Sequence, residues 1–281
     1  MTAPGNGFAA STAGAMSPGR IVEVHGRPVN LHEVGSGPDV LLLHGSGPGT
    51  TAAAAWGPLA AALAGRHRVL APDFSGFGAS QGPTGRRAWT EQMLGLLDVL
   101  GVERCAVIGN SMGGAIALSL AVARPSAVTR VIAIGTLGIA MPLPAGLDQL
   151  WGYEPSRSAA RALLELLMVS PVSDEAVEAR LRATLVPGPR AAFAAMFPPP
   201  RQRWVDDLAL TGSELASIAV PVLLVHGAQD RVVPLRDSTL PLLGLLRDAR
   251  AHVFGRVGHA SPVERPAELH RLLSTFLEDH D

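Results

Sequence analysis

The stretch Val107-Ile108-Gly109-Asn110-Ser111-Met112-Gly113-Gly114-Ala115 decides the fold of this chain. It continues an apolar run that starts at Cys105, and a helical pattern of small and apolar residues follows it. This order predicts a buried strand, a sharp turn and a helix, with Ser111 at the apex of the turn. Gly109 and Gly113 fit that turn, because residues without side chains let the strand and the helix approach closely.

A serine presented in this way is typical of the nucleophile elbow, G-x-S-x-G, of serine hydrolases. The N-terminus of the following helix has free N–H groups and a dipole that favour a developing negative charge. The same motif also arises by chance in turns of glycine-rich chains, and this chain has 31 glycines. Its position between a strand pattern and a helix pattern favours a catalytic serine over a serine in an ordinary turn.

The composition indicates one compact domain with an insertion. Of the 281 residues, 47% are hydrophobic and 17% are charged, which is typical of a globular protein. The 23 basic and 24 acidic residues are interspersed and give a net charge of −1, so we expect no nucleic-acid partner. The single cysteine, Cys105, excludes an intrachain disulfide and suits a reducing compartment. Its apolar neighbours indicate packing and not catalysis.

Residues 1–19 are rich in Ala, Gly, Ser, Thr and Pro. They contain neither a basic segment nor an apolar segment of the kind found in secretory signals, so we expect a disordered tail and not a signal peptide. No apolar stretch reaches the length that spans a membrane. The sequence therefore predicts a soluble, cytoplasmic protein without a membrane partner.

Strand and helix patterns alternate along most of the chain after an expected antiparallel hairpin at residues 20–34. The expected strands are 39–43, 67–71, 105–108, 128–134, 220–225 and 251–254, and the expected helices are 52–63, 90–100, the segment after Ser111, 235–246 and 266–277. Such alternation predicts an α/β fold, with a mostly parallel central sheet and helices on both faces.

The alternation stops in the middle of the chain. Helical patterns separated by prolines follow one another there, at residues 158–168, 174–185 and 189–196. We therefore expect an α/β core formed by residues 20–135 and 211–281, with residues 136–210 inserted into it as a helical cap.

A serine hydroxyl needs a base within hydrogen-bonding reach, and that base needs a carboxylate to orient it. After an elbow of this kind the acid comes next along the chain and the histidine comes last. Asp230 lies just past a strand pattern, and His259 lies just past the last one. Because both sit at the carboxyl ends of strands, where α/β folds build their sites, the sequence predicts a catalytic triad of Ser111, Asp230 and His259.

An oxyanion hole needs two backbone N–H groups aimed at the developing charge. We expect these from Met112, which follows the nucleophile, and from Ser46 in the glycine-rich loop 45–49. His44 is expected to stabilise this loop. The loop lacks the Lys-Ser/Thr of a P-loop and the spacing of a dinucleotide site, which excludes nucleotide binding. No spacing of histidines and carboxylates indicates a metal site.

With these partners assembled, the chain after residue 20 resembles an α/β-hydrolase over its whole length. More narrowly it is similar to the meta-cleavage product hydrolases, the carbon–carbon bond hydrolases of bacterial aromatic degradation. The stretches that carry the resemblance are His44-Gly45-Ser46-Gly47-Pro48-Gly49, Gly109-Asn110-Ser111-Met112-Gly113-Gly114, Leu150-Trp151-Gly152-Tyr153-Glu154-Pro155-Ser156, Met196-Phe197-Pro198-Pro199-Pro200-Arg201-Gln202-Arg203-Trp204 and His252-Val253-Phe254-Gly255-Arg256-Val257-Gly258-His259. Asn110 and the two cap stretches point to the branch that acts on monoalkylbenzene-derived substrates.

The resemblance implies hydrolysis of a 2-hydroxy-6-oxohexa-2,4-dienoate to a carboxylic acid and 2-hydroxypenta-2,4-dienoate. It implies no metal and no organic cofactor, and a homodimer or larger homo-oligomer. Ser111 and His259 would drive ketonisation and then attack at the 6-oxo carbon, while Asp230 would hold the imidazole in its working tautomer. Ser46 and Met112 would stabilise the tetrahedral oxyanion.

The resemblance also implies a set of substrate-binding residues. Asn110 and a cap arginine would hold the carboxylate and 2-oxo end, and Gly45 and Gly47 would line the site. Arg182 best matches that arginine, and Arg180 competes with it. A planar guanidinium can bind a carboxylate through two hydrogen bonds and polarise the adjacent oxygen.

The sequence departs from the family in two places. Ala260 follows the histidine where the family commonly has tryptophan, which removes an aromatic wall from the dienoate pocket. The segment between Arg182 and Pro187 is shortened. Both differences bear on the substrate more than on the mechanism.

Two other functions stay open at this point. One is an esterase or lactonase of the same fold, for which secondary metabolism is one setting. The other is a non-catalytic binding protein that has kept the fold, which is disfavoured because every triad position and both oxyanion elements hold competent residues.

Overall fold

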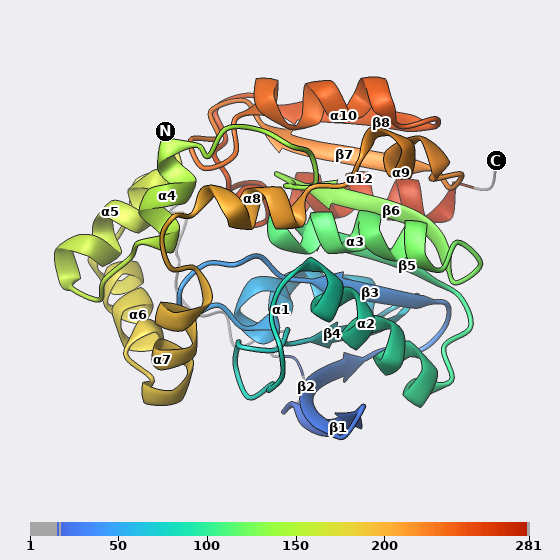
Figure 1. The fold of residues 1–281 in the computed structure, drawn as a ribbon, viewed down its shortest axis with the longest axis horizontal. Helices are drawn as coiled ribbons and strands as arrows, with labels where there is room; N and C mark the ends of the chain where they lie inside the picture. The colour runs from blue at the N-terminus through green and yellow to red at the C-terminus, as the bar shows by residue number, and fades with distance from the viewer. Residues whose placement is uncertain (1–15, 17, 280–281) are drawn as a thin grey trace, which may run out of the picture.

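A computed structural model describes residues 16 and 18–279 of the chain (Figure 1). The tail predicted for residues 1–19 falls almost wholly outside this part. The strands are β1 (Arg20–Val24), β2 (Arg27–Val34), β3 (Asp39–Leu43), β4 (Arg68–Pro72), β5 (Cys105–Asn110), β6 (Val128–Ile134), β7 (Val222–Gly227) and β8 (Ala249–Phe254). In the described residues they form one sheet in the order β1-β2-β4-β3-β5-β6-β7-β8.

The sheet is mostly parallel. β1 pairs with β2, and β2 with β4, in antiparallel fashion, which confirms the predicted opening hairpin. All the pairings from β4 through β3, β5, β6 and β7 to β8 are parallel. The predicted α/β class, with a mostly parallel central sheet, is therefore confirmed.

Helices cover both faces of the sheet, and the strands are apolar for that reason. Along β3, Leu41 and Leu43 join one buried cluster while Val40 and Leu42 join another, as the alternation of side chains in a strand requires. The first cluster includes residues of α2 (Arg86–Leu100) and α3 (Met112–Ala123). The second includes residues of α1 (Ala52–Leu63) and α12 (Pro266–Glu278).

Between β6 and β7 the chain is helical. The helices there are α4 (Ala145–Trp151), α5 (Arg157–Leu167), α6 (Asp174–Thr184), α7 (Pro187–Met196), α8 (Gln202–Leu208) and α9 (Gly212–Ser217). Figure 1 shows α4, α5, α6 and α7 gathered on one side of the molecule. The division of the chain into a core and a cap at residues 136–210 stays a prediction.

Three helical regions differ from the expected pattern. After β7 come a 3₁₀ helix (Leu235–Asp237) and α10 (Thr239–Leu245), where a single helix over 235–246 was expected. A short helix, α11 (Ser261–Glu264), precedes α12. α2 begins at Arg86, ahead of the predicted start at residue 90. Helices as short as α4, α8, α9 and α11 give too few turns to show a period in the sequence.

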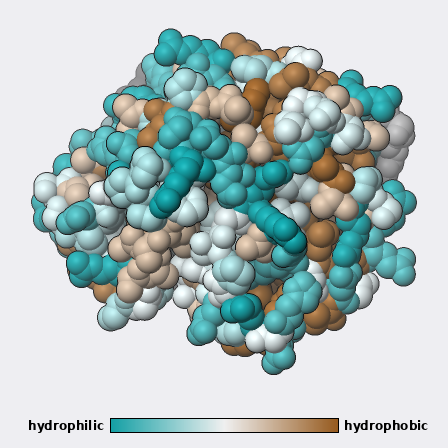
Figure 2. All heavy atoms as spheres, in the orientation of Figure 1, coloured by the Kyte–Doolittle hydropathy of each residue, from teal (hydrophilic) through white to brown (hydrophobic). Residues whose placement is uncertain are grey.

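The parallel order brings separate segments to one edge. The loops after β3, β5, β7 and β8 carry His44, Ser111, Asp230 and His259 respectively, and all four strands run in the same direction. Hydrophilic and apolar side chains are interspersed over the face seen in Figure 2. Among the described helices, none combines the length and the apolar character needed to cross a membrane.

Candidate active site

Ser111 stands in a strained turn between β5 and α3. Its backbone has φ 56° and ψ −118°. Residues other than glycine rarely adopt a positive φ. A Cβ atom on Gly109 would lie 2.1 Å from the carbonyl oxygen of Gly113, and one on Gly113 would lie 2.1 Å from that of Leu43. Neither position has room for a side chain, so both glycines are required by the close approach of strand and helix.

The end of β6 holds this turn from the side. The N–H of Ser111 donates to the carbonyl oxygen of Ile134 at 2.8 Å, and the N–H of Leu137 donates to that of Ser111 at 3.2 Å. Ser111 is only 4% exposed. Its conformation is therefore maintained by the neighbouring strand, which is how a strained residue persists in a folded protein.

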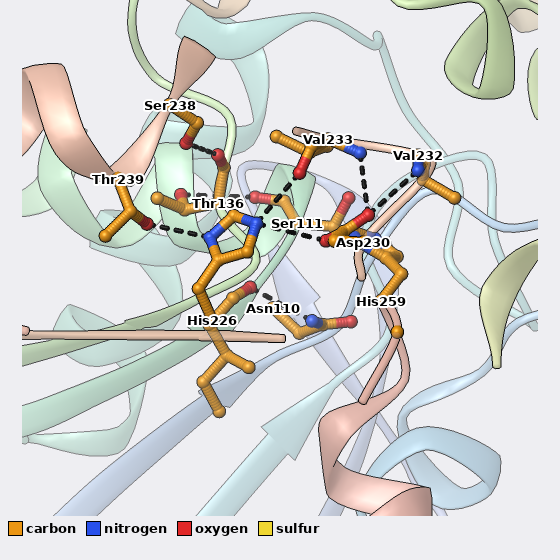
Figure 3. A network of polar contacts seen from close by, with 12 residues as sticks. Asn110, Ser111, Thr136, His226, Asp230, Val232, Val233, Ser238, Thr239 and His259 are labelled. Atoms are coloured by element: carbon orange, nitrogen blue, oxygen red, sulfur yellow. Dashed lines mark hydrogen bonds and ion pairs between the residues drawn. The ribbon is translucent and has the colours of Figure 1, made fainter. Parts of the chain in front are cut away.

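Asp230 and His259 form a hydrogen-bonded pair (Figure 3). Nδ1 of His259 donates to Oδ2 of Asp230 at 2.7 Å. The other oxygen, Oδ1, accepts from the N–H groups of Val232 and Val233, each at 2.8 Å. Because the proton sits on Nδ1, the lone pair of Nε2 is free to take a proton from a nucleophile.

Asp230 is buried yet ionised. Burial alone would raise its pKa, but electrostatic attraction to His259 and hydrogen bonds from His226 and His259 lower the pKa below its ordinary value. Nε2 of His226 lies 3.2 Å from Oδ2 of Asp230 and 2.8 Å from the carbonyl oxygen of Val233. Both of these atoms are acceptors, so Nε2 carries the proton, and Nδ1 pairs with the Thr239 hydroxyl at 2.8 Å.

Gly135, directly after β6, joins the turn at Ser111 to the pair of Asp230 and His259. It has φ 51°, and a Cβ atom there would lie 3.1 Å from Nδ1 of His259 and 3.3 Å from Oδ2 of Asp230. Its chain neighbour Ile134 accepts the hydrogen bond from Ser111. Because Gly135 has no side chain, the imidazole of His259 has room beside the end of β6.

Ser111 and His259 line one cavity of about 150 Å³. The loop after β3 forms one wall, the residues after His259 form another, and residues of α4, α5 and α6 cover it. Other residues that line the cavity include Gly45, Ser46, Gly47, Asn110, Arg180 and Ala260. The structure therefore brings the predicted nucleophile, base and loop together.

The loop after β3 is oriented by a neutral histidine. Nε2 of His44 accepts from the N–H of Phe74 at 3.1 Å, so the proton is on Nδ1, which donates to the carbonyl oxygen of Gly45 at 2.8 Å. Burial lowers the pKa of His44, which keeps the ring uncharged. In a trans peptide the N–H points opposite to the C=O, so this bond turns the N–H of Ser46 away from His44.

The loop also lies against the elbow. A Cβ atom on Gly45 would come within 3.2 Å of the Cβ of Ser111. Met112 is the first residue of α3, where the N–H groups have no partner within the helix. The two predicted oxyanion donors, Ser46 and Met112, directly follow Gly45 and Ser111 in the chain, and their role as donors stays a prediction.

Comparisons with known proteins agree with this geometry. A model of the family described as "alpha/beta hydrolase fold" matches residues 38–266. The chain is 42% identical to the 2-hydroxy-6-oxo-2,4-heptadienoate hydrolase of Pseudomonas putida, covering 94% of this chain and 97% of that one. It is 40% identical to the 2-hydroxymuconate semialdehyde hydrolase of Pseudomonas sp. strain CF600, covering 94% and 95%.

Among solved structures, a serine-to-alanine mutant of the meta-cleavage product hydrolase from Pseudomonas fluorescens IP01, complexed with acetates, superposes with a TM-score of 0.90. It is 36% identical and covers 92% of this chain and 97% of that chain. The chain belongs to the meta-cleavage product hydrolases of the α/β-hydrolase fold.

The structure places the two candidate cap arginines differently. Arg182 is exposed to solvent, whereas Arg180 lines the cavity with Ser111. Two residues along an α-helix turn the side chain by about 200°, so only one of these arginines can face the cavity. The geometry therefore does not support a substrate contact for Arg182 and favours Arg180.

Arg180 is a partly buried cation without an acidic partner among the described residues. Its Nη1 donates to the carbonyl oxygen of Pro48 at 3.0 Å, and none of the ion pairs between described residues includes it. Burial lowers the pKa of Arg180, since the cation loses water. A partly buried guanidinium with unused donors loses part of its hydration, a cost that an anion bound there would offset.

The other predicted binding residues also border the cavity. Gly45, Gly47 and Asn110 line it, and the Asn110 side chain donates to the carbonyl oxygen of Ile134 at 3.0 Å. Ala260 lines it too, where the family commonly has tryptophan, and packs beside Leu167.

Other reactive groups of the hydrolase lie outside this site. Burial raises the pKa of the Cys105 thiol to about 12, which makes it unreactive. The described residues contain no group of three side chains able to hold a metal ion.

His226 is a residue of the site that the sequence analysis does not single out. It contacts the carboxylate of Asp230. Its only sequence signal is its position four residues before that acid, at the end of the same strand.

Proposed function

We propose that the chain hydrolyses the C5–C6 bond of a 2-hydroxy-6-oxohexa-2,4-dienoate, without a metal or organic cofactor. The observation that carries this proposal is the position of Arg180, which is partly buried, has no acidic partner among the described residues and lines the same cavity as Ser111 and His259. An ordinary ester needs no cation at this depth. A substrate with a carboxylate at one end and a ketone at the other would use both groups.

Substrate binding follows from the positions of the polar groups. The guanidinium of Arg180 binds the carboxylate and the 2-oxygen, and Asn110 lines the same cavity. The 6-oxo carbon then lies beside Ser111. Proton transfer through His259 converts the dienol to the keto form, in which C5 can accept electrons when the bond to C6 breaks.

The bond cleavage uses the triad and the two N–H groups. Nε2 of His259 takes the proton of Ser111, whose oxygen attacks C6, and the N–H groups of Ser46 and Met112 stabilise the oxyanion. The C5–C6 bond breaks, C5 receives a proton, and the acyl group stays on Ser111. Water then releases the carboxylic acid and restores the serine, so one water molecule is consumed.

The size of the cavity favours a small group on C6. Its volume of about 150 Å³ is below the ~300–1,000 Å³ of sites that enclose drug-sized ligands. The two relatives of 40–42% identity are named for substrates whose C6 carries a methyl group or a hydrogen. We expect the chain to prefer hydrogen or a short alkyl group there over phenyl.

The test is the turnover of three substrates by the purified protein. Loss of the yellow dienolate colour is followed with 2-hydroxy-6-oxohepta-2,4-dienoate and with its 6-phenyl analogue, and p-nitrophenyl acetate reports esterase activity. We expect fast cleavage of the 6-methyl compound to acetate and 2-hydroxypenta-2,4-dienoate, identified by NMR. Fast ester turnover with no dienoate cleavage would assign an esterase instead.

The assembly and location of the protein are part of the same proposal. β8 is an edge strand, and Leu240, Leu243 and Leu245 of the adjoining α10 are exposed, in a region with apolar surface in Figure 2. These features support a homodimer through this edge. Sedimentation of the wild type and of Leu243→Lys tests it, and a wild-type monomer would refute it.

A cytoplasmic location suits the unpaired Cys105 and is tested by fractionating the native host.

A further inference from the structure

Glu264 is a buried carboxylate outside the site described above. It is the last residue of α11, five positions after His259, and is only 6% exposed. Acidic side chains are rarely buried unless hydrogen bonds satisfy both oxygens. The partners of this carboxylate therefore indicate what it does.

One oxygen of Glu264 holds the loop that carries His259. Oε2 accepts from the N–H of Gly258 at 2.6 Å. Gly258 immediately precedes His259, so this bond fixes the backbone from which the imidazole projects. The bond is short, as is typical when the acceptor is charged.

The other oxygen holds the helical segment that covers the cavity. Oε1 accepts from the N–H groups of Val169 and Ser170, both at 2.8 Å, and from the Ser170 hydroxyl at 3.0 Å. These residues directly follow α5, whose Leu163 and Leu167 line the cavity. One side chain thus binds two segments that are distant in the sequence.

The same two segments also touch through their backbones. The N–H of Ala260 donates to the carbonyl oxygen of Leu167 at 3.0 Å. A Cβ atom on Gly258 would lie 2.6 Å from that carbonyl oxygen, so glycine is required for the approach. Residues 258–260 therefore rest on residues 167–170, with the Glu264 carboxylate beside the contact.

We propose that Glu264 is a positioning residue that couples the docking of residues 167–170 to the alignment of His259. Its effect on activity passes through the histidine, so the inference rests on the role given to His259 in the proposed function. A carboxylate suits this task because both of its oxygens accept, whereas the amide of glutamine would turn a donor toward one of the two segments. That segment would then keep a buried N–H without a partner.

The test compares Glu264→Gln with Glu268→Gln, a matched control on the exposed surface of α12. For Glu264→Gln we expect kcat for the dienoate to fall at least about tenfold with KM changed less than about twofold, because a small displacement of the base impairs chemistry more than binding. Amide exchange should accelerate at Gly258 and at Ser170 together. Glu268→Gln should match the wild type in all three measurements.

Two more variants keep the test decisive if Glu264→Gln folds poorly. Glu264→Asp keeps two acceptor oxygens and should recover part of the lost kcat, and Ser170→Ala removes a single hydrogen bond and should have a smaller effect. A purely structural role would lower the melting temperature of these variants while leaving kcat unchanged at temperatures where they are folded. That result would overturn the proposal.

Labelling of Ser111 by a fluorophosphonate separates this inference from the choice of substrate. The reaction needs the serine and its base but not a dienoate. We expect the labelling rate of Glu264→Gln to fall by the same factor as kcat. If no dienoate is cleaved and labelling still slows, the proposed substrate fails and the coupling stands; wild-type labelling of Glu264→Gln would refute the coupling.

Discussion

At the scale of single residues, the direction in which a side chain points from its helix matters more than the residue type. Arg180 and Arg182 are the same residue type, two positions apart on α6, yet one lines the cavity and the other faces solvent. The amino-acid pattern of α6 alone leaves this choice open, because arginines occur on both exposed and pocket-facing sides. The hydrogen bond from Arg180 to the carbonyl oxygen of Pro48 favours Arg180.

Replacing each arginine separately tests this assignment. We expect Arg180→Gln to lower kcat/KM for the dienoate by about 10–150-fold, the value of a hydrogen bond to a charged group of ~1.5–3 kcal/mol. Arg182→Gln should stay within about twofold of the wild type, as expected for an exposed position. Steady-state kinetics of both variants measure this, and the reverse order would contradict the assignment.

Gly135 is a second position where adding a single Cβ atom would disturb the site. It has φ 51°, and an added Cβ would lie 3.1 Å from Nδ1 of His259. We expect Gly135→Ala to lower stability by about 1–2 kcal/mol from the left-handed backbone alone, and to reduce kcat by displacing the imidazole. Gly244→Ala is the control, since a Cβ there has no neighbour within 4 Å. Urea unfolding and kinetics check both, and an active Gly135→Ala would show that the imidazole tolerates the shift.

At the scale of elements, the loop after β3 depends on an uncharged histidine. The pKa of His44 is lowered by burial, so the folded protein keeps the ring neutral while the unfolded chain takes up a proton below pH ~6.5. The stability that neutral His44 contributes is thus fully present above that pH and is lost as the pH falls. Stability changes with pH in the same direction for any group whose pKa is lowered on folding.

The pH dependence of this contribution to stability can be measured with a variant of His44. We expect the gap in unfolding free energy between the wild type and His44→Gln to shrink below pH ~6.5, by at most about 1.4 kcal/mol per pH unit. Urea unfolding at pH 7.5 and at pH 5.5 measures the gap. A gap that grows as the pH falls would mean that His44 is charged in the folded state.

The elements themselves were predictable where the pattern was long. α1 and β6 have the bounds expected from the sequence, because a periodic or apolar run fills each of them. α2 starts earlier than expected, at Arg86, since Gly85 ends the preceding loop and polar residues open the helix. α11 was not predicted, and with it the role of Glu264, because a four-residue helix has no period and the partners of Glu264 come from a distant segment.

At the scale of the whole molecule, the sheet assembles the site. Ser111, Asp230 and His259 follow separate strands, and parallel pairing of β5 through β8 carries their loops to one edge. Their order along the chain was enough to predict this convergence. The sequence could not give the register of the covering helices or the size of the cavity, since both depend on how α4, α5 and α6 pack over the elbow.

The central claim is that the Ser111 hydroxyl performs the chemistry on a dienoate. The most direct measurement is the rate at which wild type and Ser111→Ala convert 2-hydroxy-6-oxohepta-2,4-dienoate to acetate, quantified by NMR. We expect Ser111→Ala to bind the substrate yet to lose at least about 10³-fold in the rate of acetate release. Acetate release by Ser111→Ala at a rate near that of the wild type would contradict it.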